Sequence, residues 1–175
     1  QDQPQCAHLQ LSVNVSARQF RQSDFVHQVI ETLQVTGARA HLLTLELTES
    51  LVLDNVEDAI DKMHQLRTKG VRFSVDDFGT GYSSLAYLTR LPLHQLKIDQ
   101  SFVRNLGVRP SDDVIVQTII GMGRNLDLEV LAEGVETEAQ KALLIAHGCD
   151  LYQGYLLARP MPVADFERTL NSGAA

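Results

Sequence analysis

Short apolar runs alternate along the chain with longer segments in which apolar residues recur every three or four positions. The runs are rich in β-branched residues and predict strands at residues 9–15, 43–47, 71–75, 95–98, 129–131 and 151–156. The longer segments place their apolar residues on one helical face and predict helices at residues 25–33, 56–66, 114–126, 138–146 and 163–170. The pattern therefore predicts a chain built from repeated strand–helix units.

Residues that favour helix ends support these boundaries. Side chains able to accept hydrogen bonds from first-turn N–H groups precede the second, fourth and fifth helices: Asp54 or Asn55, Ser111 and Thr137. Glycines stand where three helices should end: Gly37, Gly70 and Gly148. Pro162 suits the first turn of the last helix, because a proline there loses no hydrogen bond.

Strands that alternate with helices predict a parallel sheet with right-handed crossovers. An open doubly wound sheet and a (β/α)₈ barrel both meet this description. A complete barrel takes about 250 residues, whereas this chain has 175. We therefore expect an α/β fold, an incomplete (β/α)₈ TIM-like barrel with about six of the eight units. It should form one domain over residues 1–171, followed by a short tail at 172–175.

Composition narrows the class of protein. The net charge is −7 and no basic stripe is present, which argues against binding of polymeric nucleic acid. No apolar stretch approaches the roughly 20 residues of a membrane span. We therefore expect a soluble, cytoplasmic domain, although other regions of a longer parent protein could anchor it to a membrane. Cys6 and Cys149 lack the spacing of metal ligands and are predicted to be free thiols.

Polar side chains collect at the ends of the predicted strands, the edge at which parallel α/β folds build active sites. They are Asn14, Glu46, Glu49, Asp76, Asp77, Lys97, Asp99, Glu133, Glu136 and Gln153. Carboxylates that converge on one rim repel one another unless they share protons or cations. Oxygen ligands suit Mg²⁺ or Mn²⁺, and the absence of histidine from these strand ends argues against zinc.

Asp76 and Asp77 are the most informative pair. Adjacent side chains on a strand point to opposite faces, so both can reach one site only where the strand ends. Gly79 and Gly81 supply a turn that would end it. Two neighbouring carboxylates of this kind suit a hydrolytic centre whose two metal ions lie about 3.5–4 Å apart.

Several of these residues also have a purely structural interpretation. Asn14 could close a turn, and Glu46 could form an ion pair with Lys97 instead of binding a metal. Asp99 could cap the following helix, with support of Lys97 as its alternative role. Glu136 could simply favour a helix N-terminus. These alternatives stay open at the level of the sequence.

Taken in order, short motifs of this chain resemble those of the EAL-domain cyclic di-GMP phosphodiesterases. The motifs are Asn14-Val15-Ser16, Glu46-Leu47-Thr48-Glu49-Ser50, Asp76-Asp77-Phe78-Gly79-Thr80-Gly81-Tyr82-Ser83-Ser84-Leu85, Leu96-Lys97-Ile98-Asp99, Ala132-Glu133-Gly134-Val135-Glu136, Gln153-Gly154-Tyr155 and Arg159-Pro160. Each motif alone is weak, but their order and spacing together are specific. The resemblance covers residues 11–162.

The resemblance implies a barrel and a metal-dependent hydrolase that opens cyclic di-GMP to linear pGpG with two Mg²⁺ or Mn²⁺ ions. It implies the following metal ligands: Asn14, Glu46, Asp76, Asp77 and Glu133. It implies catalytic roles for Lys97, beside the attacking water, and for Glu133. The candidates for substrate contact or for support of the site are Gln153, Glu136 and Asp99.

The resemblance also implies partners. Glu49 would anchor the glycine-rich loop that contains Gly79, Thr80 and Gly81. In the family this loop couples dimerisation to the metal site, so a homodimer through the loop and the adjacent helix is expected. A sensory or GGDEF-type domain is expected upstream in the parent protein.

One departure from the family pattern is large. The Glu-Ala-Leu motif, with its metal-binding glutamate, does not occur in this sequence. We therefore expect the chain to be inactive alone and its parent domain to be competent. The alternative is a non-catalytic receptor for cyclic di-GMP. Receptors of this kind usually lose acidic site residues, and the acidic residues present here favour the enzyme.

Overall fold

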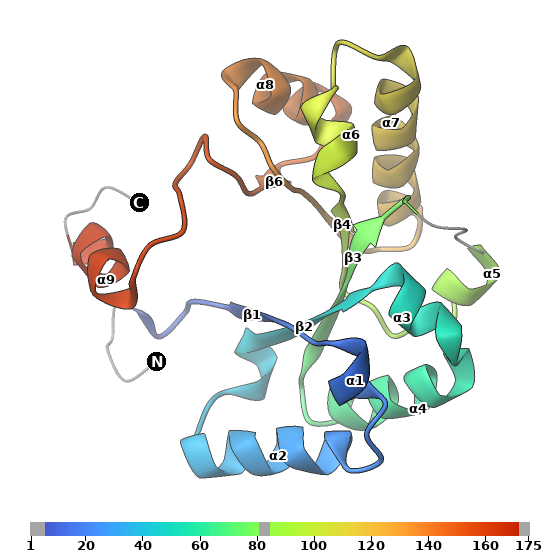
Figure 1. Ribbon diagram of the computed structural model, residues 1–175, viewed down its shortest axis with the longest axis vertical. Coiled ribbons are helices and arrows are strands. Elements are labelled where there is room, and N and C mark those ends of the chain that lie inside the picture. The colour runs from blue at the N-terminus through green and yellow to red at the C-terminus, as the bar shows by residue number, and fades with distance from the viewer. Residues whose placement is uncertain (1–5, 81–84, 172–175) are drawn as a thin grey trace.

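The computed structural model describes residues 6–80 and 85–171, and in it six parallel strands form one curved sheet (Figure 1). The strands are β1 (Leu11–Asn14), β2 (Leu43–Thr48), β3 (Arg72–Phe78), β4 (Gln95–Ile98), β5 (Glu129–Ala132) and β6 (Leu151–Tyr152). Each strand pairs with the next one along the chain. A doubly wound sheet reverses its strand order at a switch point. The sequential order therefore confirms the incomplete barrel.

Helices cover the outer side of this sheet, except for the last helix, which stands apart from the sheet (Figure 1). They are α1 (Ala17–Phe20), α2 (Phe25–Thr36), α3 (Glu49–Asp54), α4 (Val56–Arg67), α5 (Leu85–Leu88), α6 (Gln100–Arg104), α7 (Pro110–Asn125), α8 (Glu138–His147) and α9 (Val163–Asn171), with a 3₁₀ turn η2 (Ala40–Leu42). The short helices α1, α3, α5 and α6 follow strand ends and were not predicted. With four to six residues each, they are too short to show a helical period.

The core lies between the outer face of the sheet and the helices. Alternate residues of the central strands are buried in it: Leu45 and Leu47, Phe73 and Val75, and Leu96 and Ile98. Because side chains alternate along a strand, the residues between them face the inside of the barrel. Those residues are polar and include Glu46, Ser74 and Lys97. The apolar packing of one face therefore sets the direction of the charged side chains on the other.

Several predicted helix caps are confirmed, but the cap predicted at Ser111 is wrong. Asn55 caps α4, and Thr137 forms a capping box with Gln140 at the start of α8. The predicted cap Ser111 instead lies inside α7, which begins at Pro110. Proline suits the first helical position because its φ angle is already helical and its missing N–H would have no partner there.

The last strand is much shorter than predicted and ends at Tyr152. Gly154 then passes so close to Val135 that a Cβ atom on the glycine would lie 2.2 Å from the Val135 carbonyl oxygen. Gln153 accepts a hydrogen bond from the Val135 N–H at 3.0 Å, and Leu156 donates one to the Val135 carbonyl at 3.0 Å. The chain therefore turns around Val135, and the apolar run at 151–156 is not one strand.

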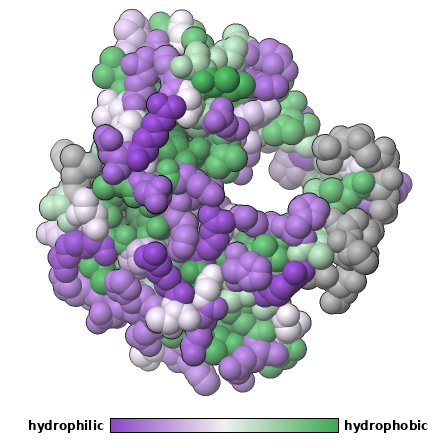
Figure 2. All heavy atoms as spheres, turned by 180° about the vertical axis from the view of Figure 1, so that it is seen from behind, coloured by the Kyte–Doolittle hydropathy of each residue, from purple (hydrophilic) through white to green (hydrophobic). Residues whose placement is uncertain are grey.

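Among the described strands, none pairs with the outer edges of β1 and β6. Leu11 and Val13 on β1 are 60% and 40% exposed, and Leu151 on β6 is 43% exposed. The body is hollowed between the barrel wall and the lobe that contains α9 (Figure 2). The described part of the sheet therefore does not close into a complete barrel.

Two further findings concern membrane-spanning helices and the state of a cysteine. None of the described helices combines the length and the apolar character that crossing a membrane requires. Cys149 is a free thiol, as predicted; it is also buried, and burial raises the pKa of its thiol to about 11. Since the thiolate is the reactive form of cysteine, Cys149 is a packing residue.

Candidate metal and catalytic site

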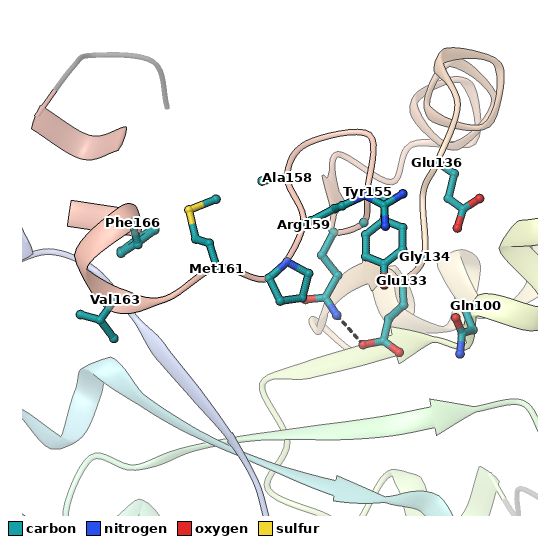
Figure 3. Close-up of a pocket in the computed structure, with 13 residues that line it drawn as sticks. Gln100, Glu133, Gly134, Glu136, Tyr155, Ala158, Arg159, Met161, Val163 and Phe166 are labelled. Carbon is teal, nitrogen blue, oxygen red and sulfur yellow. Dashed lines mark hydrogen bonds between the residues drawn. The ribbon is translucent and has the colours of Figure 1, made fainter. Parts of the chain in front are cut away.

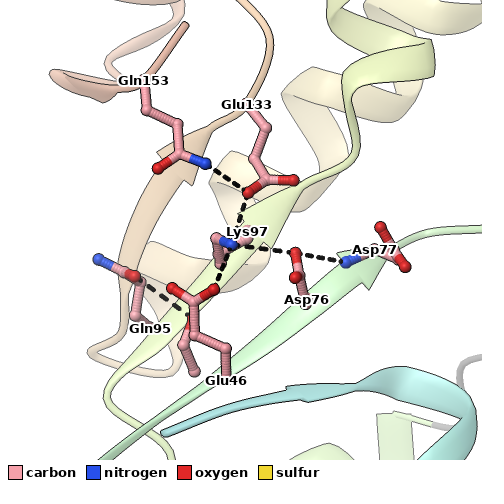
Figure 4. A network of polar contacts seen from close by, with 8 residues as sticks. Glu46, Asp76, Asp77, Gln95, Lys97, Glu133 and Gln153 are labelled. Carbon is pink, nitrogen blue, oxygen red and sulfur yellow. Dashed lines mark hydrogen bonds and ion pairs between the residues drawn. The ribbon is translucent and has the colours of Figure 1, made fainter. Parts of the chain in front are cut away.

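Three carboxylates from different strands surround one lysine at the carboxyl end of the sheet (Figure 4). The Nζ atom of Lys97 on β4 lies 2.7 Å from Glu46 Oε2, 3.1 Å from Asp76 Oδ1 and 2.5 Å from Glu133 Oε1. The side chain of Lys97 is 4% exposed, that of Glu46 8%, and those of Asp76 and Glu133 15%. An ammonium group has three N–H donors, and here each carboxylate can accept one.

The neighbouring apolar residues explain this arrangement. Leu45 and Leu47 pack against the helices, so Glu46 between them faces inward. Leu96 and Ile98 do the same for Lys97. The ion pair that the sequence offered as an alternative role for Glu46 is therefore present. Charges as buried as these require partners, because removal from water is unfavourable for each of them alone.

Asp76 and Asp77 reach one site by a route that the sequence did not predict. Strand β3 does not end at Asp77 but continues to Phe78. Its register with β4 shifts between Val75 and Phe78, which adds one residue to β3. Asp77 in this bulge has a left-handed φ of 55°, and its N–H donates to Asp76 Oδ1 at 3.0 Å. A bulge of this kind re-aims side chains beside a site.

The bulge brings three carboxylates together. Asp76, Asp77 and Glu133 each offer an oxygen atom, and these atoms lie within 4.8 Å of one another. The set contains only carboxylate oxygens, which are the ligands that hard divalent cations prefer. The residues present therefore fit a divalent metal ion.

Burial and charge shift the pKa values of Asp77, Glu133 and Lys97. Burial raises the pKa of Asp77, and the negative charges of Asp76 and Asp99 raise it further. Burial also raises the pKa of Glu133, against the lowering effect of Lys97. Burial alone would lower the pKa of Lys97, but its contacts with Glu133 and Glu46 raise it above the ordinary value. Lys97 is therefore a permanent cation at neutral pH.

The contact expected of the loop anchor is present. The Gly79 N–H donates to Glu49 Oε2 at 3.3 Å, and Glu49 is buried. Gly79 has a φ of 95°, and a Cβ atom there would lie 3.1 Å from a methyl group of Ile119. Thr80 Oγ1 donates to the Asp77 carbonyl at 2.8 Å. Gly81 lies outside the described residues, and the coupling role of the loop stays a prediction.

Two other candidates join the cluster. Gln153 Nε2 donates to Glu133 Oε1 at 2.7 Å, so it orients that carboxylate. Asp99 caps α6 by accepting from the Ser101 N–H at 2.9 Å, which confirms the structural interpretation. Asp99 also lies within hydrogen-bonding reach of Asp77. The negative charge of Asp99 raises the pKa of Asp77, and support of Lys97 by Asp99 stays a prediction.

Two candidates lie at the margin of the cluster. Asn14 pairs in register with Glu46, but its side chain is exposed and lines a groove between β1 and α2. Glu136 is exposed and lines a cavity of about 690 Å³ beside the cluster (Figure 3). Neither side chain contacts the lysine-centred cluster. Their ligand and substrate roles stay predictions.

The same cavity contains residues to which the sequence assigned no role. The guanidinium carbon of Arg159 lies 4.4 Å from the centre of the Tyr155 ring, and Gln100 also lines this cavity (Figure 3). Tyr155 and Arg159 belong to motifs that the sequence singled out, and that was the available signal. Gln100 carried no such signal, because it lies in a helix too short to be predicted.

Fold and site together define an α/β-barrel protein with a carboxylate–lysine centre at the carboxyl ends of its strands. A family model described as the EAL domain matches residues 1–160. This chain belongs to the EAL domain family.

Relatives with known names agree with this assignment. The cyclic di-GMP phosphodiesterase NbdA of Pseudomonas aeruginosa is 44% identical over 164 residues, which are 94% of this chain and 21% of NbdA. The bifunctional diguanylate cyclase/cyclic di-GMP phosphodiesterase MucR of the same species is 45% identical over 152 residues, 87% of this chain and 22% of MucR. This chain therefore spans about a fifth of the length of these curated relatives.

Solved structures show the same fold. The complex of the P. aeruginosa MucR phosphodiesterase with cyclic di-GMP has a TM-score of 0.87 and 44% identity, covering 90% of this chain and 64% of that one. A manganese and cyclic di-GMP complex of Klebsiella pneumoniae BlrP1 has a TM-score of 0.79 and 32% identity, covering 86% of this chain and 39% of that one.

Proposed function

We propose that this chain forms part of the catalytic domain of a phosphodiesterase that hydrolyses cyclic di-GMP to linear pGpG. The observation that carries the proposal is the group of Asp76, Asp77 and Glu133 at the active-site rim of the barrel, two of which, Asp76 and Glu133, also pair with Lys97. The substrate is inferred from the relatives, since MucR and BlrP1 have been solved with cyclic di-GMP. We assign the domain to residues 1–171 and treat 172–175 as a tail.

We assign two divalent cations, Mg²⁺ or Mn²⁺, to the cluster. The manganese complex of BlrP1 supports this assignment. The ligands that we propose are Asn14, Glu46, Asp76, Asp77 and Glu133. When bound, the ions would neutralise the phosphodiester and make water a better nucleophile near neutral pH.

The chain's own residues contribute position and charge. Lys97 holds a positive charge inside the cluster, which favours the anionic form of a water molecule beside it. Glu133 receives hydrogen bonds from Lys97 and from Gln153 on the same oxygen, Oε1. This leaves its other oxygen, Oε2, to face a ligand. Asp76 accepts a hydrogen bond from the Asp77 N–H and Glu49 accepts one from the Gly79 N–H, so the bulge and the turn after it keep one conformation.

The cavity beside the cluster supports a substrate with a planar base. Its volume of about 690 Å³ lies within the range of sites for small ligands. Tyr155 is 52% exposed and offers an aromatic face, with Arg159 beside it. We propose that one guanine lies here, with Glu136 at the mouth in contact with the substrate or its water. The phosphate next to it would then lie near Glu133, which lines the same cavity.

Partners of the parent protein are also proposed. A homodimer through the loop after Asp77 and the adjacent helix would place the Glu49–Gly79 contact between the interface and the site. A sensory or GGDEF-type domain upstream is supported by MucR, whose name records a diguanylate cyclase as a second activity. The domain would act in the cytoplasm, where such partners supply the nucleotide.

The test is hydrolysis by a protein that contains the complete domain. We expect Mn²⁺- or Mg²⁺-dependent conversion of cyclic di-GMP to pGpG, followed by liquid chromatography, and loss of turnover in EDTA. The 175-residue chain assayed beside it should give no turnover. Binding of cyclic di-GMP without any pGpG would instead support the receptor alternative. If the protein neither bound nor hydrolysed cyclic di-GMP with either metal, the proposed substrate would be rejected.

A further inference from the structure

We propose that the Lys97 ammonium is the protein's own counter-cation for the metal site. It holds Glu46, Asp76 and Glu133 together while no metal is bound and competes with the divalent ion for them. This inference rests on the proposed function, because it concerns the same site. It assigns to Lys97 a second task, control of metal affinity, that is separate from its place near the reacting water.

Lys97 balances the negative charge of the metal-free site. Its three N–H donors meet three carboxylates from β2, β3 and the end of β5, and its side chain is 4% exposed. Among the described residues, Lys97 is the only cation paired with any of these three carboxylates. Without it, three acidic groups with little access to water would face one another. The apo site therefore depends on this single positive charge.

Lys97 and a metal ion would share two of the same carboxylates. Asp76 and Glu133 pair with Lys97 and also belong to the group of three carboxylates that can share a metal ion. A divalent ion held by these residues must lie within a few ångströms of the ammonium group. The two cations repel each other, and little water separates them. Lys97 therefore weakens metal binding while it stabilises the metal-free protein.

One effect opposes this repulsion. Lys97 engages Oδ1 of Asp76 and Oε1 of Glu133, and it could help to orient their other oxygens toward a metal. That benefit is small, because Asp76 Oδ1 also accepts from the Asp77 N–H and Glu133 Oε1 also accepts from Gln153. Both carboxylates keep an orienting partner when Lys97 is replaced. Removal of the repulsion should therefore dominate.

The test compares Mn²⁺ binding by the full 175-residue chain and by neutral variants, measured by isothermal titration calorimetry. Lys97→Met removes the charge and the donors, and Lys97→Gln removes the charge but keeps an amide donor. Both should bind Mn²⁺ at least tenfold more tightly than wild type. Both should also unfold at lower temperature than wild type in EDTA, and Mn²⁺ should raise their melting temperatures by more than it raises that of wild type.

Lys62→Met is the matched control. Lys62 on α4 is also buried, with Nζ 2.8 Å from Asp58 Oδ2 and 2.8 Å from the Phe20 carbonyl oxygen, but it faces the outer helices. Its loss should lower the melting temperature with and without metal and leave the Mn²⁺ dissociation constant within twofold of wild type. A Lys97 variant that is unfolded in EDTA should fold when Mn²⁺ is added in excess, because the bound ion replaces the missing positive charge.

The outcomes separate this inference from the proposed function. Equal or weaker Mn²⁺ binding by both Lys97 variants, with binding by wild type, would overturn only the inference. A Lys97 variant that Mn²⁺ fails to fold would count against it in the same way. Absence of Mn²⁺ binding by wild type and by both Lys97 variants would overturn the inference and the metal site together.

Discussion

At the scale of single residues, the site depends on backbone geometry as much as on charge. Asp77 has a φ of 55°, a conformation that is unusual for a residue other than glycine but that aspartate and asparagine adopt more readily than most. Asp77 occupies it inside a bulge whose effect is to join two consecutive carboxylates in one cluster. A substitution at Asp77 can therefore change the backbone, the charge or both, and the two effects need separate controls.

Asp77→Asn separates them, because asparagine tolerates the same backbone conformation while losing the charge. In a protein that contains the complete domain, we expect turnover of cyclic di-GMP to fall at least about 100-fold, the upper end of what is lost with an outer partner of a metal ligand. The control is Asp127→Asn. Asp127 is the other described non-glycine residue with positive φ, at 56°, and it is exposed. Equal turnover of the two variants would remove Asp77 from the proposed ligands.

His94 makes the fold sensitive to acid. Its Nδ1 accepts a hydrogen bond from the Phe73 N–H at 3.2 Å, so this nitrogen carries no proton in the folded protein. Burial lowers the pKa of His94, and the positive charges of Arg72 and Arg67 lower it further, against the opposing charge of Glu129. The folded state therefore binds the proton less readily than the unfolded chain does. The stability that His94 contributes is present above a pH of about 6.5, the ordinary pKa of histidine, and is lost as the pH falls below it.

Replacement of His94 should reveal this dependence. We expect the free energy of unfolding of His94→Gln to fall less steeply than that of wild type between pH 6.5 and the lower pKa of the folded state. The measurement is urea unfolding followed by circular dichroism at a series of pH values. His64→Gln, at an exposed position on α4, is the control and should keep the slope of wild type. A wild-type slope in His94→Gln would show that His94 titrates alike in both states.

At the scale of elements, the close approach of helices to strands limits which residues fit. Helix α7 carries two glycines, Gly121 and Gly123, which are two positions apart and therefore lie on nearly opposite faces of the helix. A Cβ atom on Gly123 would lie 2.1 Å from a methyl group of Val130 on β5, whereas a Cβ atom on Gly121 would meet nothing within 4 Å. The helix therefore packs against the sheet through one glycine, and the other has no packing role.

The two glycines allow a matched comparison. Gly121→Ala should stabilise the protein by about 0.5–1 kcal/mol, because alanine is the better helix former. Gly123→Ala gains the same propensity but must overpack against Val130, which costs about 1–3 kcal/mol, so its net effect should be destabilising. Urea unfolding of the two variants gives the difference directly. Equal stabilisation by both would mean that β5 moves away without strain.

At the scale of the whole molecule, the described sheet leaves two edges open. An edge strand with exposed apolar residues is a template for pairing with another chain. Strand β1 has Leu11 and Val13 exposed, and β6 has Leu151 exposed. The 175-residue chain should therefore self-associate through these edges, and its association should respond to charge on an edge strand more than to charge elsewhere.

Val13→Lys tests the edge. A lysine on an edge strand disfavours pairing with another sheet. We expect light scattering over a concentration series to show less self-association for Val13→Lys than for wild type. Val35→Lys is the control, since Val35 is 81% exposed but lies on α2. The two variants behaving alike, or a wild-type chain that stays monomeric throughout, would contradict the role of the edge.

Much of the fold was predictable from local pattern. Alternation of apolar and polar residues, as at Leu45, Glu46 and Leu47, indicates a strand with two different faces, because the side-chain period of a strand is two. The long helices were found in the same way, from a period near 3.6. Their caps at Asn55 and Thr137 were also predictable, since capping depends on residues three positions apart. Position at strand ends further identified most of the residues that form the cluster.

Only the tertiary structure decided how those residues meet. The bulge at Asp76 and Asp77 depends on pairing with β4, which lies about 20 residues further along the chain. The end of β6 depends on the approach of Gly154 to Val135, and the placement of Lys97 among three carboxylates depends on the curvature of the sheet. Local sequence sets the kind of element and the chemistry that it carries. Distances between elements arise from packing across the fold, where residues distant in sequence restrict one another's positions.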